Sequence, residues 1–368
     1  MNEIKTTCLH SRHVDLGAQM SPFAGFDMPI SYEGITEEHN AVRTACGVFD
    51  VSHMGEVLVE GPEAEAFVNY IFTNDVAPMK PGDVVYGMML HPDGGVVDDL
   101  LVYRLKADAF LLVINASNID KDVDWINANR DGFNAQVTNL SDDAAEIAVQ
   151  GPEAEKVMEE VLGIACADLT FYTFKVTELP DGRKLLVSRT GYTGEDGFEV
   201  YAAPDVIQAY WDKLLASGRC APCGLGCRDT LRFEAGLPLY GDELADDITP
   251  VEAGLSMFVK LDKPEGFIGR KACATQKAEG PARKSVGLEI HDRAIARHGC
   301  DVIDPATDRV IGVVTTGYRG ISTPRSIAVA LIDAKYAAKG TDVAVRVRRK
   351  VFPATVTARR FVPTHYKK

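Results

Sequence analysis

Hydrophobic and polar residues alternate after residue 196, and this alternation predicts a β-strand. Phe198 and Val200 supply strand-forming side chains on either side of Glu199. Residues 193–197 before them read Thr-Gly-Glu-Asp-Gly, a composition typical of a tight turn. Because successive side chains of a strand point to opposite faces, we expect Glu199 on the face away from Phe198 and Val200.

A helix is predicted shortly after this strand. We expect it to begin near residues 228–230 (Arg-Asp-Thr) and to end at Gly236, a residue type common just past helix ends. The carboxylate of Glu199 and the guanidinium of Arg228 would then lie on neighbouring elements, where they suit a ligand with paired donors and an anionic group. A buried Glu–Arg pair that only stabilises the fold explains the same pattern, so both interpretations stay open.

Two adjacent carboxylates mark another predicted strand, in the segment GGVVDDLLVYRL at residues 94–105. The two glycines predict a turn before the strand, and the alternation of a strand sends Asp98 and Asp99 to opposite faces. One carboxylate is therefore expected to cap or hydrogen-bond the turn while the other points into a site. The pattern alone also allows both residues to be turn formers.

A short internal repeat indicates two related units. The segment VEGPEAEAFV at residues 59–68 recurs as VQGPEAEKVM at residues 149–158. Each copy predicts a strand, a Gly-Pro turn and a helix with glutamates in its first turn, where negative charge favours the helix dipole. Apolar alternating segments follow each copy. We therefore predict two related α+β units, whose shared face is a natural place for a pocket.

The pattern changes after about residue 267. A polar, interrupted segment predicts a connector with one short helix. Beyond it, β-branched runs separated by turn signals predict an all-β module; these runs cover residues 285–290, 309–317, 326–332, 342–352 and 354–362.

Composition is that of an ordinary globular chain of 368 residues with 46% hydrophobic content, for which two or three domains are expected. No apolar run approaches the roughly 20 residues that span a bilayer. The first 20 residues lack the apolar core of a signal peptide. We therefore expect a cytoplasmic protein with no membrane partner.

Charge is distributed unevenly. Residues 341–368 contain eight Lys or Arg and one Asp, whereas the whole chain has a formal net charge of −14. In residues 342–352 valines alternate with Arg346 and Arg348, which predicts a strand with a basic face. This face is either a solvated edge strand guarded by charge or a docking patch for an acidic partner. The acidic overall balance disfavours nucleic acid as a partner.

Eight cysteines in a chain with no secretion signal are expected to stay reduced. One cluster has a spacing that suits a thiolate metal site, namely Cys220, Cys223 and Cys227. No second ligand pair follows at a zinc-ribbon spacing, so we expect no metal.

Several segments together resemble the aminomethyltransferase of the glycine cleavage system, the T-protein family. They occur in family order along nearly the whole chain, and they are GYTGEDGFEVY, GLGCRDTLRFEAGLPLYGDEL, FAGFDMPISYEGITEEH, GVFDVSHMGEV, GGVVDDLLVY, VINASN, TPVEAGL and FVPTHY. The resemblance implies an α+β fold with three domains arranged like a cloverleaf around a folate cavity, the third being a β-barrel-like domain. We place the domains at residues 1–55 with 145–260, at 56–144 and at 276–368.

The resemblance also implies a reaction. An aminomethyl group arrives on the lipoyl arm of a carrier protein (H protein), ammonia leaves, and tetrahydrofolate, the co-substrate, becomes 5,10-methylenetetrahydrofolate. Asp99 falls on the family's catalytic aspartate. Folate-contacting positions of the family match Glu199, Arg228, Asn115 and Tyr366, with Met54 a weaker candidate. His53 and His39 are expected to be structural.

Two segments depart from the family pattern, residues 317–324 and residues 256–258. Both are expected near the mouth used by the carrier arm, so two alternative functions stay open. One is a tetrahydrofolate-dependent demethylase acting on a small methyl donor. The other is a non-enzymatic folate-binding protein, although the Lys-Gly-Cys motif of such iron–sulfur assembly factors is absent at residues 189–192.

Overall fold

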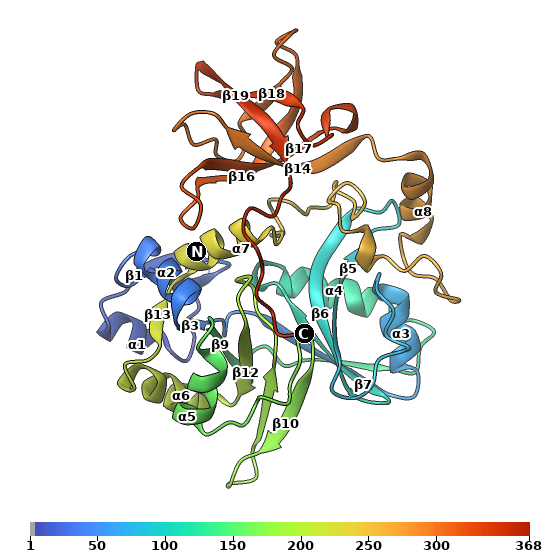
Figure 1. Cartoon of the computed structure of the whole chain (residues 1–368). Coiled ribbons are helices and arrows are strands. Elements are labelled where there is room, and N and C mark those ends of the chain that lie inside the picture. The colour runs from blue at the N-terminus through green and yellow to red at the C-terminus, as the bar shows by residue number, and fades with distance from the viewer. Residues whose placement is uncertain (1–3) are drawn as a thin grey trace.

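The computed structural model describes residues 4–368, which form three lobes around the descending C-terminal segment (Figure 1). Two lobes are α+β units built on separate sheets, and the third is a closed β-barrel. This architecture confirms the predicted fold class. The domain boundaries given above stay a prediction, and residues 1–3 of the first domain lie outside the described range.

The first unit is built on a sheet whose strands run in the order β10 (Phe174–Glu178), β11 (Lys184–Ser188), β12 (Gly197–Ala202), β9 (Ala145–Gln150), β3 (Gly47–Asp50) and β13 (Ala221–Cys223). A two-stranded ribbon accompanies it, formed by β1 (Gln19–Phe23) and β2 (Phe26–Ser31). The helices of this unit are α1 (His10–Asp15), α2 (Ile35–Thr44), α5 (Ala154–Leu162), α6 (Pro204–Ala216) and α7 (Leu225–Ala235).

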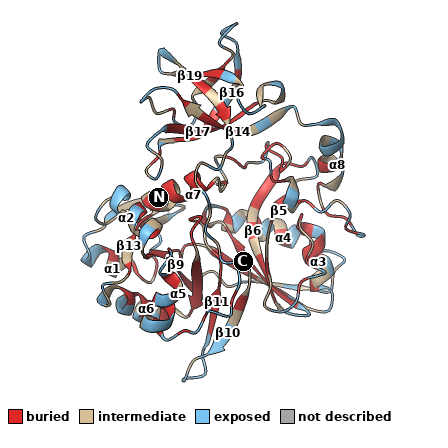
Figure 2. Cartoon of the chain, viewed as in Figure 1, coloured by how far each residue is buried: buried red, intermediate tan, exposed pale blue. Residues whose placement is uncertain are grey.

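The second unit has a sheet in the order β5 (Val84–Leu90), β6 (Val96–Lys106), β7 (Ala109–Ile114), β4 (Gly55–Glu60) and β8 (Gln136–Asn139). Its helical segments are α3 (Ala64–Ile71), the single 3-10 turn η1 (Ala116–Asn118) and α4 (Ile119–Ala128). Buried residues, red in Figure 2, concentrate on the strands of both sheets and on the inward faces of their helices.

The predicted repeat is confirmed and extends to sheet topology. β4 followed by α3 corresponds to β9 followed by α5, and each first strand pairs antiparallel with the last strand of a three-stranded meander. The turns match as well, because Gly61 has a φ of 133° and Gly151 a φ of 129°. Only glycine adopts such values without strain.

A connector with α8 (Arg270–Glu279) leads to the barrel, as predicted, after the short turn η2 (Ser256–Phe258). The barrel closes in the order β14 (Arg283–Ile290), β17 (Ser326–Asp333), β16 (Val310–Arg319), β15 (Asp301–Ile303), β18 (Asp342–Val347) and β19 (Lys350–Thr357), with the turn η3 (Ala334–Tyr336) before β18. The prediction that residues 342–352 form one strand is wrong. A turn with Arg348 at φ 56° splits the first run, and its second half joins residues 354–357 as β19.

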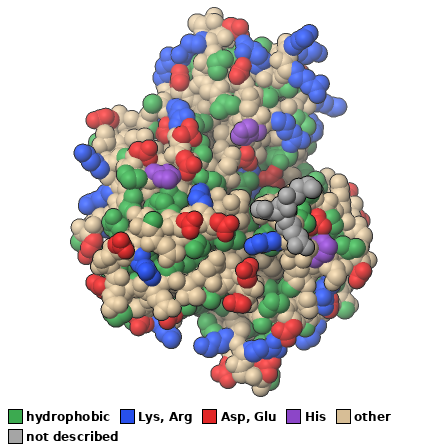
Figure 3. All heavy atoms as spheres, turned by 180° about the vertical axis from the view of Figure 1, so that it is seen from behind, with side chains coloured by type: hydrophobic (Ala, Val, Ile, Leu, Met, Phe, Trp, Pro, Cys, Tyr) green, Lys and Arg blue, Asp and Glu red, His purple; other side chains and the backbone are tan. Residues whose placement is uncertain are grey.

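The edge-strand interpretation of the basic segment is also wrong, because the closed barrel pairs β18 with both β15 and β19. Arg346 forms ion pairs at 2.9 Å with Asp301 and with Asp308. In the view of Figure 3, several blue Lys and Arg side chains gather over the barrel, and others are scattered over the two lower lobes. The docking-patch interpretation stays a prediction.

Helix α7 ends before Gly236 as predicted, where φ is 74°, but it begins at Leu225, before the predicted start. The reason is a distant acceptor. The carboxylate of Glu38, on α2, accepts a hydrogen bond at 2.8 Å from the backbone N–H of Gly224, the residue that precedes the helix. A local sequence pattern does not contain this contact.

The described residues include no helix that is long and apolar enough to cross a membrane.

Candidate active site

A cavity of about 480 Å³ lies between the two sheets and the C-terminal segment. Its wall combines residues from β5, β6 and β7 of the second unit with residues from β9, β12 and α7 of the first unit. All six residues predicted from the sequence line it, although they come from distant parts of the chain: Met54, Asp99, Asn115, Glu199, Arg228 and Tyr366. The shared face of the two units does therefore form a pocket, as expected.

Asp99 reaches the cavity from β6, and both of its carboxylate oxygens are held. Tyr86 donates its hydroxyl to Oδ2 at 2.8 Å, and the amide Nδ2 of Asn115 donates to Oδ1 at 3.0 Å. Enclosure in the cavity wall, followed by the charge of Asp98, raises the pKa of Asp99 to about 7. A carboxyl group with a pKa near neutrality can both accept and release a proton at physiological pH.

Asp98 lies on the opposite face of the strand, which confirms the predicted alternation. It does not bind the Gly-Gly turn; that expectation is wrong, because Asp93 already accepts from the N–H of Gly95 at 3.2 Å. Asp98 instead accepts hydrogen bonds from Asn115 and Asn118, the residues that immediately precede η1 and α4.

Glu199 and Arg228 do not form the buried ion pair that the pattern allowed. In the described chain, the Glu199 carboxylate accepts from Thr190, and the Nη1 atom of Arg228 is buried without a hydrogen-bond partner. The guanidinium instead lies over the ring of Tyr192, 4.9 Å from its centroid. Burial raises the pKa of Glu199. A buried hydrogen-bond donor without an acceptor is unfavourable unless a ligand supplies the acceptor. The unpaired donor beside a carboxylate therefore favours a polar binding site here.

Glu146 is a lining residue that the sequence analysis missed. It lies on β9, is 2% exposed, and its Oε2 atom has no hydrogen-bond partner among the described residues. Burial, followed by the charges of Glu199 and Glu56, raises its pKa well above the ordinary value. The cavity therefore offers a further unsatisfied polar group near Glu199 and Arg228.

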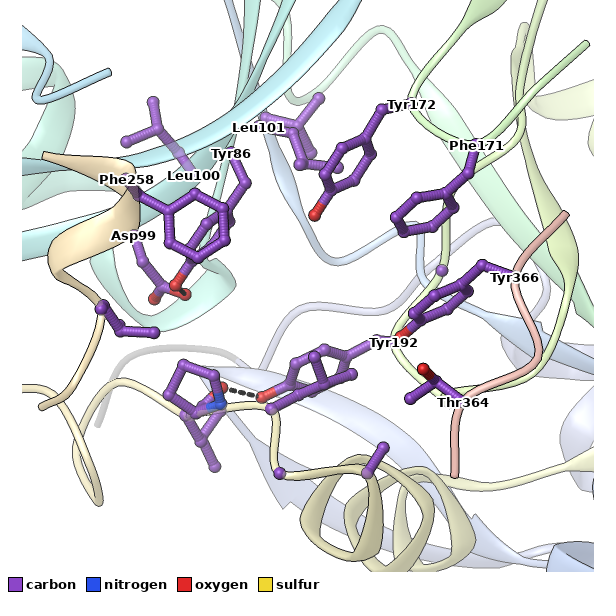
Figure 4. Close-up of a pocket in the computed structure, with 18 of the residues that line it drawn as sticks. Tyr86, Asp99, Leu100, Leu101, Phe171, Tyr172, Tyr192, Phe258, Thr364 and Tyr366 are labelled. Atoms are coloured by element: carbon purple, nitrogen blue, oxygen red, sulfur yellow. Dashed lines mark hydrogen bonds between the residues drawn. The ribbon is translucent and has the colours of Figure 1, made fainter. Parts of the chain in front are cut away.

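Aromatic rings form another part of the wall that the sequence analysis missed. Phe171 stacks on Tyr172 with centroids 4.2 Å apart and on Tyr366 with centroids 4.1 Å apart. Figure 4 shows this row facing Tyr86 and Asp99 across the cavity, with Tyr192 below. A flat conjugated ligand suits such a row. No local pattern predicts it, because the rings come from separate segments.

Of the weaker candidates, Met54 lines the cavity and the two histidines do not. Met54 lines the cavity and also packs in two hydrophobic clusters, so it has a structural role too. Neither His53 nor His39 lines the cavity. Burial lowers the pKa of His53 to about 4, and its ring packs edge-on against Phe23. His39 bridges Thr230 and Ser322, both at 2.8 Å.

The three cysteines of the cluster lie in two different environments. Cys220 contacts Cys46, with the two sulfur atoms 3.3 Å apart, whereas Cys223 and Cys227 lie near Glu38. The Glu38 carboxylate already accepts three backbone N–H groups, and burial raises the pKa of the Cys227 thiol well above its usual range. The Glu38 carboxylate is therefore engaged in contacts within the fold.

The two segments that depart from the family pattern have different positions. Residues 317–324 are not part of the cavity wall, and Ile321 and Ser322 donate backbone N–H groups to Glu234 on α7. Their position near the mouth used by the carrier arm stays a prediction. Met257 and Phe258 do line the cavity, and Met257 is 71% exposed.

Comparison with known families agrees with this architecture. The family described as the GCVT N-terminal domain matches residues 9–263, and the glycine cleavage T-protein C-terminal barrel domain matches residues 283–363. The chain belongs to the glycine cleavage T-protein family. This membership confirms the resemblance and the expected enzyme class, an aminomethyltransferase.

Individual relatives of this family match over their whole length. The chain is 48% identical to an aminomethyltransferase of Alkaliphilus oremlandii, with 100% of both chains covered. It is 45% identical to one from Clostridium botulinum strain Langeland, with 98% of both covered. Among solved structures, the glycine cleavage system aminomethyltransferase T from Bartonella henselae superimposes with a TM-score of 0.93 at 35% identity, again over 100% of both chains.

Proposed function

We propose that this T-protein family member transfers an aminomethyl group from the lipoyl arm of a carrier protein (H protein) to tetrahydrofolate. Ammonia leaves, and 5,10-methylenetetrahydrofolate and the reduced dihydrolipoyl carrier are formed. One observation carries the proposal: a single cavity combines a carboxyl group whose pKa is near neutrality, unpaired buried polar groups and a row of aromatic rings. These are the features that a folate co-substrate and a proton-transfer step require.

The polar end of the cavity suits the pterin ring. A carboxylate such as Glu199 can accept from two adjacent donors, and the 2-amino group and N3–H of a pterin are such a pair. The buried Nη1 of Arg228 has no hydrogen-bond acceptor among the described residues. A carbonyl oxygen of the ligand would supply one. Asn115 borders the same cavity, while Tyr366 and Met54 supply apolar contact.

Asp99 is assigned to proton transfer. The lost amine must be protonated and the folate nitrogens must give up protons as the methylene bridge forms, first at N5 and then at N10. A carboxyl group with a pKa of about 7 suits both directions. As carboxylate it also favours the positive charge that develops on the transferred carbon. The remaining catalysis is positioning of the folate nitrogens against the sulfur-bound carbon.

The test is a reconstituted reaction of the full chain with tetrahydrofolate and an aminomethyl-loaded lipoyl carrier. We expect methylenetetrahydrofolate and ammonia in equal amounts, both dependent on the carrier. Asp99→Asn should lower turnover on the order of a hundredfold or more while tetrahydrofolate affinity changes little. The matched control is Asp124→Asn, an exposed aspartate on α4, which should behave as the unmodified chain.

Two results would overturn this assignment. Folate-dependent removal of a methyl group from a small donor, without need of a carrier, would point to a demethylase. An equal loss of turnover and folate affinity in Asp99→Asn would place Asp99 in binding rather than in proton transfer.

A further inference from the structure

Two buried carboxyl groups lie behind the cavity wall next to Asp99, and nothing in the proposed reaction uses them directly. They are Asp98, on β6, and Asp122, on α4. Both are 0% exposed, and neither lines the cavity. Burying two carboxyl groups together is unfavourable unless they are hydrogen-bonded or share a proton.

Asp98 is surrounded by N–H donors. The backbone N–H of Asn115 donates to Oδ2 at 3.0 Å, the side-chain amide of Asn115 donates to Oδ1 at 2.8 Å, and the amide of Asn118 donates to Oδ1 at 2.7 Å. Three such donors favour the ionised form of a carboxyl group. Asp98 is the immediate neighbour of Asp99 on β6, and its charge contributes to the raised pKa of Asp99.

Asp122 has the opposite environment. Neither of its oxygens has a hydrogen-bond partner among the described donors, and the ammonium of Lys121 is 3.8 Å away. That ammonium donates to the backbone carbonyl of Val97 and lies over the ring of Tyr240. Burial, followed by its interaction with Asp98, raises the pKa of Asp122 to about 11. Asp122 is then a neutral acid with one O–H to donate, and Asp98 is the neighbouring acceptor.

Asn115 connects this pair to the site. Its side-chain Nδ2 contacts Oδ1 of Asp98 at 2.8 Å and Oδ1 of Asp99 at 3.0 Å, so one amide is oriented by both carboxyl groups. The hydroxyl of Tyr86 holds the second oxygen of Asp99 (Figure 4). The contacts therefore run without a gap from Asp98 through Asn115 to Asp99.

We propose that Asp98 and Asp122 are positioning residues for Asp99. Asp122 donates its proton to Asp98, and Asp98 fixes the orientation of the Asn115 amide. The charge of Asp98 in turn sets the protonation of Asp99. This inference rests on the proton-transfer role of Asp99 proposed above. It assigns a function in the reaction to two residues that do not touch the ligand.

Other titratable groups facing these carboxyl groups do not supply the same charge. Tyr86, Tyr172 and Tyr192 face Asp99 from β5 and from two loops, and burial raises the pKa of each above its usual range, so these phenols are neutral at pH 7. Lys121 and Tyr240 face Asp98 and Asp122 from the far side. Asp98 is therefore the negative charge that acts on Asp99 near neutral pH.

The experiment measures the pH dependence of kcat with the full chain, saturating tetrahydrofolate and loaded carrier. Asp98→Asn removes the charge, so we expect the inflection caused by Asp99 to move to lower pH by about one unit or more. Asp122→Asn keeps a donor for Asp98 and should retain the profile and most of the turnover. Asp122→Leu removes that donor and should lower kcat about tenfold or more, with tetrahydrofolate affinity within about twofold. Asp124→Asn, exposed on the same helix, is the control.

The proposal is overturned if the Asp98→Asn profile coincides with that of Asp124→Asn, or if Asp122→Leu is as active as Asp122→Asn. Should Asp98→Asn not bind tetrahydrofolate, and thus be misfolded, the two Asp122 variants decide. The parallel Asp99→Asn assay separates the two levels of inference. If Asp99→Asn keeps its turnover, the proposed proton-transfer role of Asp99 is wrong. If Asp99→Asn loses turnover but the Asp98 and Asp122 variants behave as the control, only the positioning role of Asp98 and Asp122 is wrong.

Discussion

Tyr366 stacks on Phe171 with ring centroids 4.1 Å apart and an interplanar angle of 15°. The two rings are nearly 200 positions apart in sequence, and the stack brings the end of the chain into the cavity wall. The neighbouring residues are fixed too, because the N–H of His365 donates to the carbonyl of Gly194 and the N–H of Phe171 donates to that of Lys367. The stack and these backbone hydrogen bonds together hold Tyr366 in the cavity wall.

Removing the Tyr366 ring should therefore weaken folate binding. Aromatic pairs contribute about 0.5–1.5 kcal/mol beyond their buried area, so Tyr366→Ala should raise the Kd of tetrahydrofolate by roughly threefold to tenfold or more. Tyr366→Phe keeps the stack and should bind nearly as tightly. Isothermal titration calorimetry of the two variants measures the difference. Equal affinity of the alanine and phenylalanine variants would exclude a role for the stack.

Tyr86→Phe should shift the pH profile in the direction opposite to Asp98→Asn. The Tyr86 hydroxyl donates to the Asp99 carboxylate and lowers the pKa of Asp99. A hydrogen bond to a charged group contributes about 1.5–3 kcal/mol, so its loss should move the Asp99 inflection to higher pH by about one to two units. Tyr70→Phe, which removes the hydroxyl of an exposed residue that does not line the cavity, is the control. A shift to lower pH would contradict the contact.

Arg228→Gln should weaken tetrahydrofolate binding before it affects turnover. The guanidinium lies over Tyr192 and has a buried unpaired Nη1, which is suited to a ligand acceptor. Loss of a charged hydrogen bond should raise the Kd about tenfold to a hundredfold. Arg228→Lys should restore little, because an ammonium lacks the planar donor fork. The exposed Arg130→Gln is the matched control. A fall in kcat at unchanged Kd would instead place Arg228 in the chemistry.

Gly151→Ala should destabilise the fold more than Gly132→Ala. Both glycines have positive φ values, 129° and 92°, but a methyl group at Gly151 would lie 2.5 Å from the carbonyl oxygen of Ala45, whereas one at Gly132 meets nothing within 4 Å. The strained backbone alone costs about 1–2 kcal/mol, and the clash adds to it only at Gly151. Chemical denaturation midpoints compare the two. Equal losses would mean that the repeat turn relaxes without cost.

Local patterns predicted what depends on neighbouring residues. Alternation assigned Asp98 and Asp99 to opposite faces and turned Glu199 away from the core, and the short repeat predicted two units with a shared pocket. The hairpin at Arg348 was not predicted, because a valine–arginine alternation continues through the turn without a glycine or proline. Neither was the start of α7, which depends on the carboxylate of Glu38, a residue far away in sequence.

Residues of the cavity wall were predictable where the family resemblance supplied positions, and less so elsewhere. Phe171, Tyr172 and Tyr192 lie in irregular segments whose side-chain directions follow no period. Their meeting at one wall depends on how the two units pack together. Glu146 lies on a strand next to the second repeat copy, and a glutamate among the apolar residues of a buried strand was the one signal that could have marked it.

Glu56 should make the fold less stable as pH rises, because it is a buried acid without a counter-ion. It is 2% exposed on β4, its Oε2 has no hydrogen-bond partner in residues 4–368, and burial raises its pKa from about 4.5 to about 8. The folded chain therefore keeps a proton that the unfolded chain releases between these values. Unfolding then releases a proton, so the free energy of unfolding falls as pH increases from about 4.5 to 8.

The Glu56→Gln variant cannot ionise at this position, so its stability should not fall in this way. At pH 8 it should be more stable than the unmodified chain by on the order of a few kcal/mol, and near pH 4.5 the two should be similar. Glu60→Gln, on the exposed end of the same strand, is the control. Urea denaturation at both pH values tests this, and a Glu56→Gln effect that does not change with pH would show that Glu56 acts through packing instead.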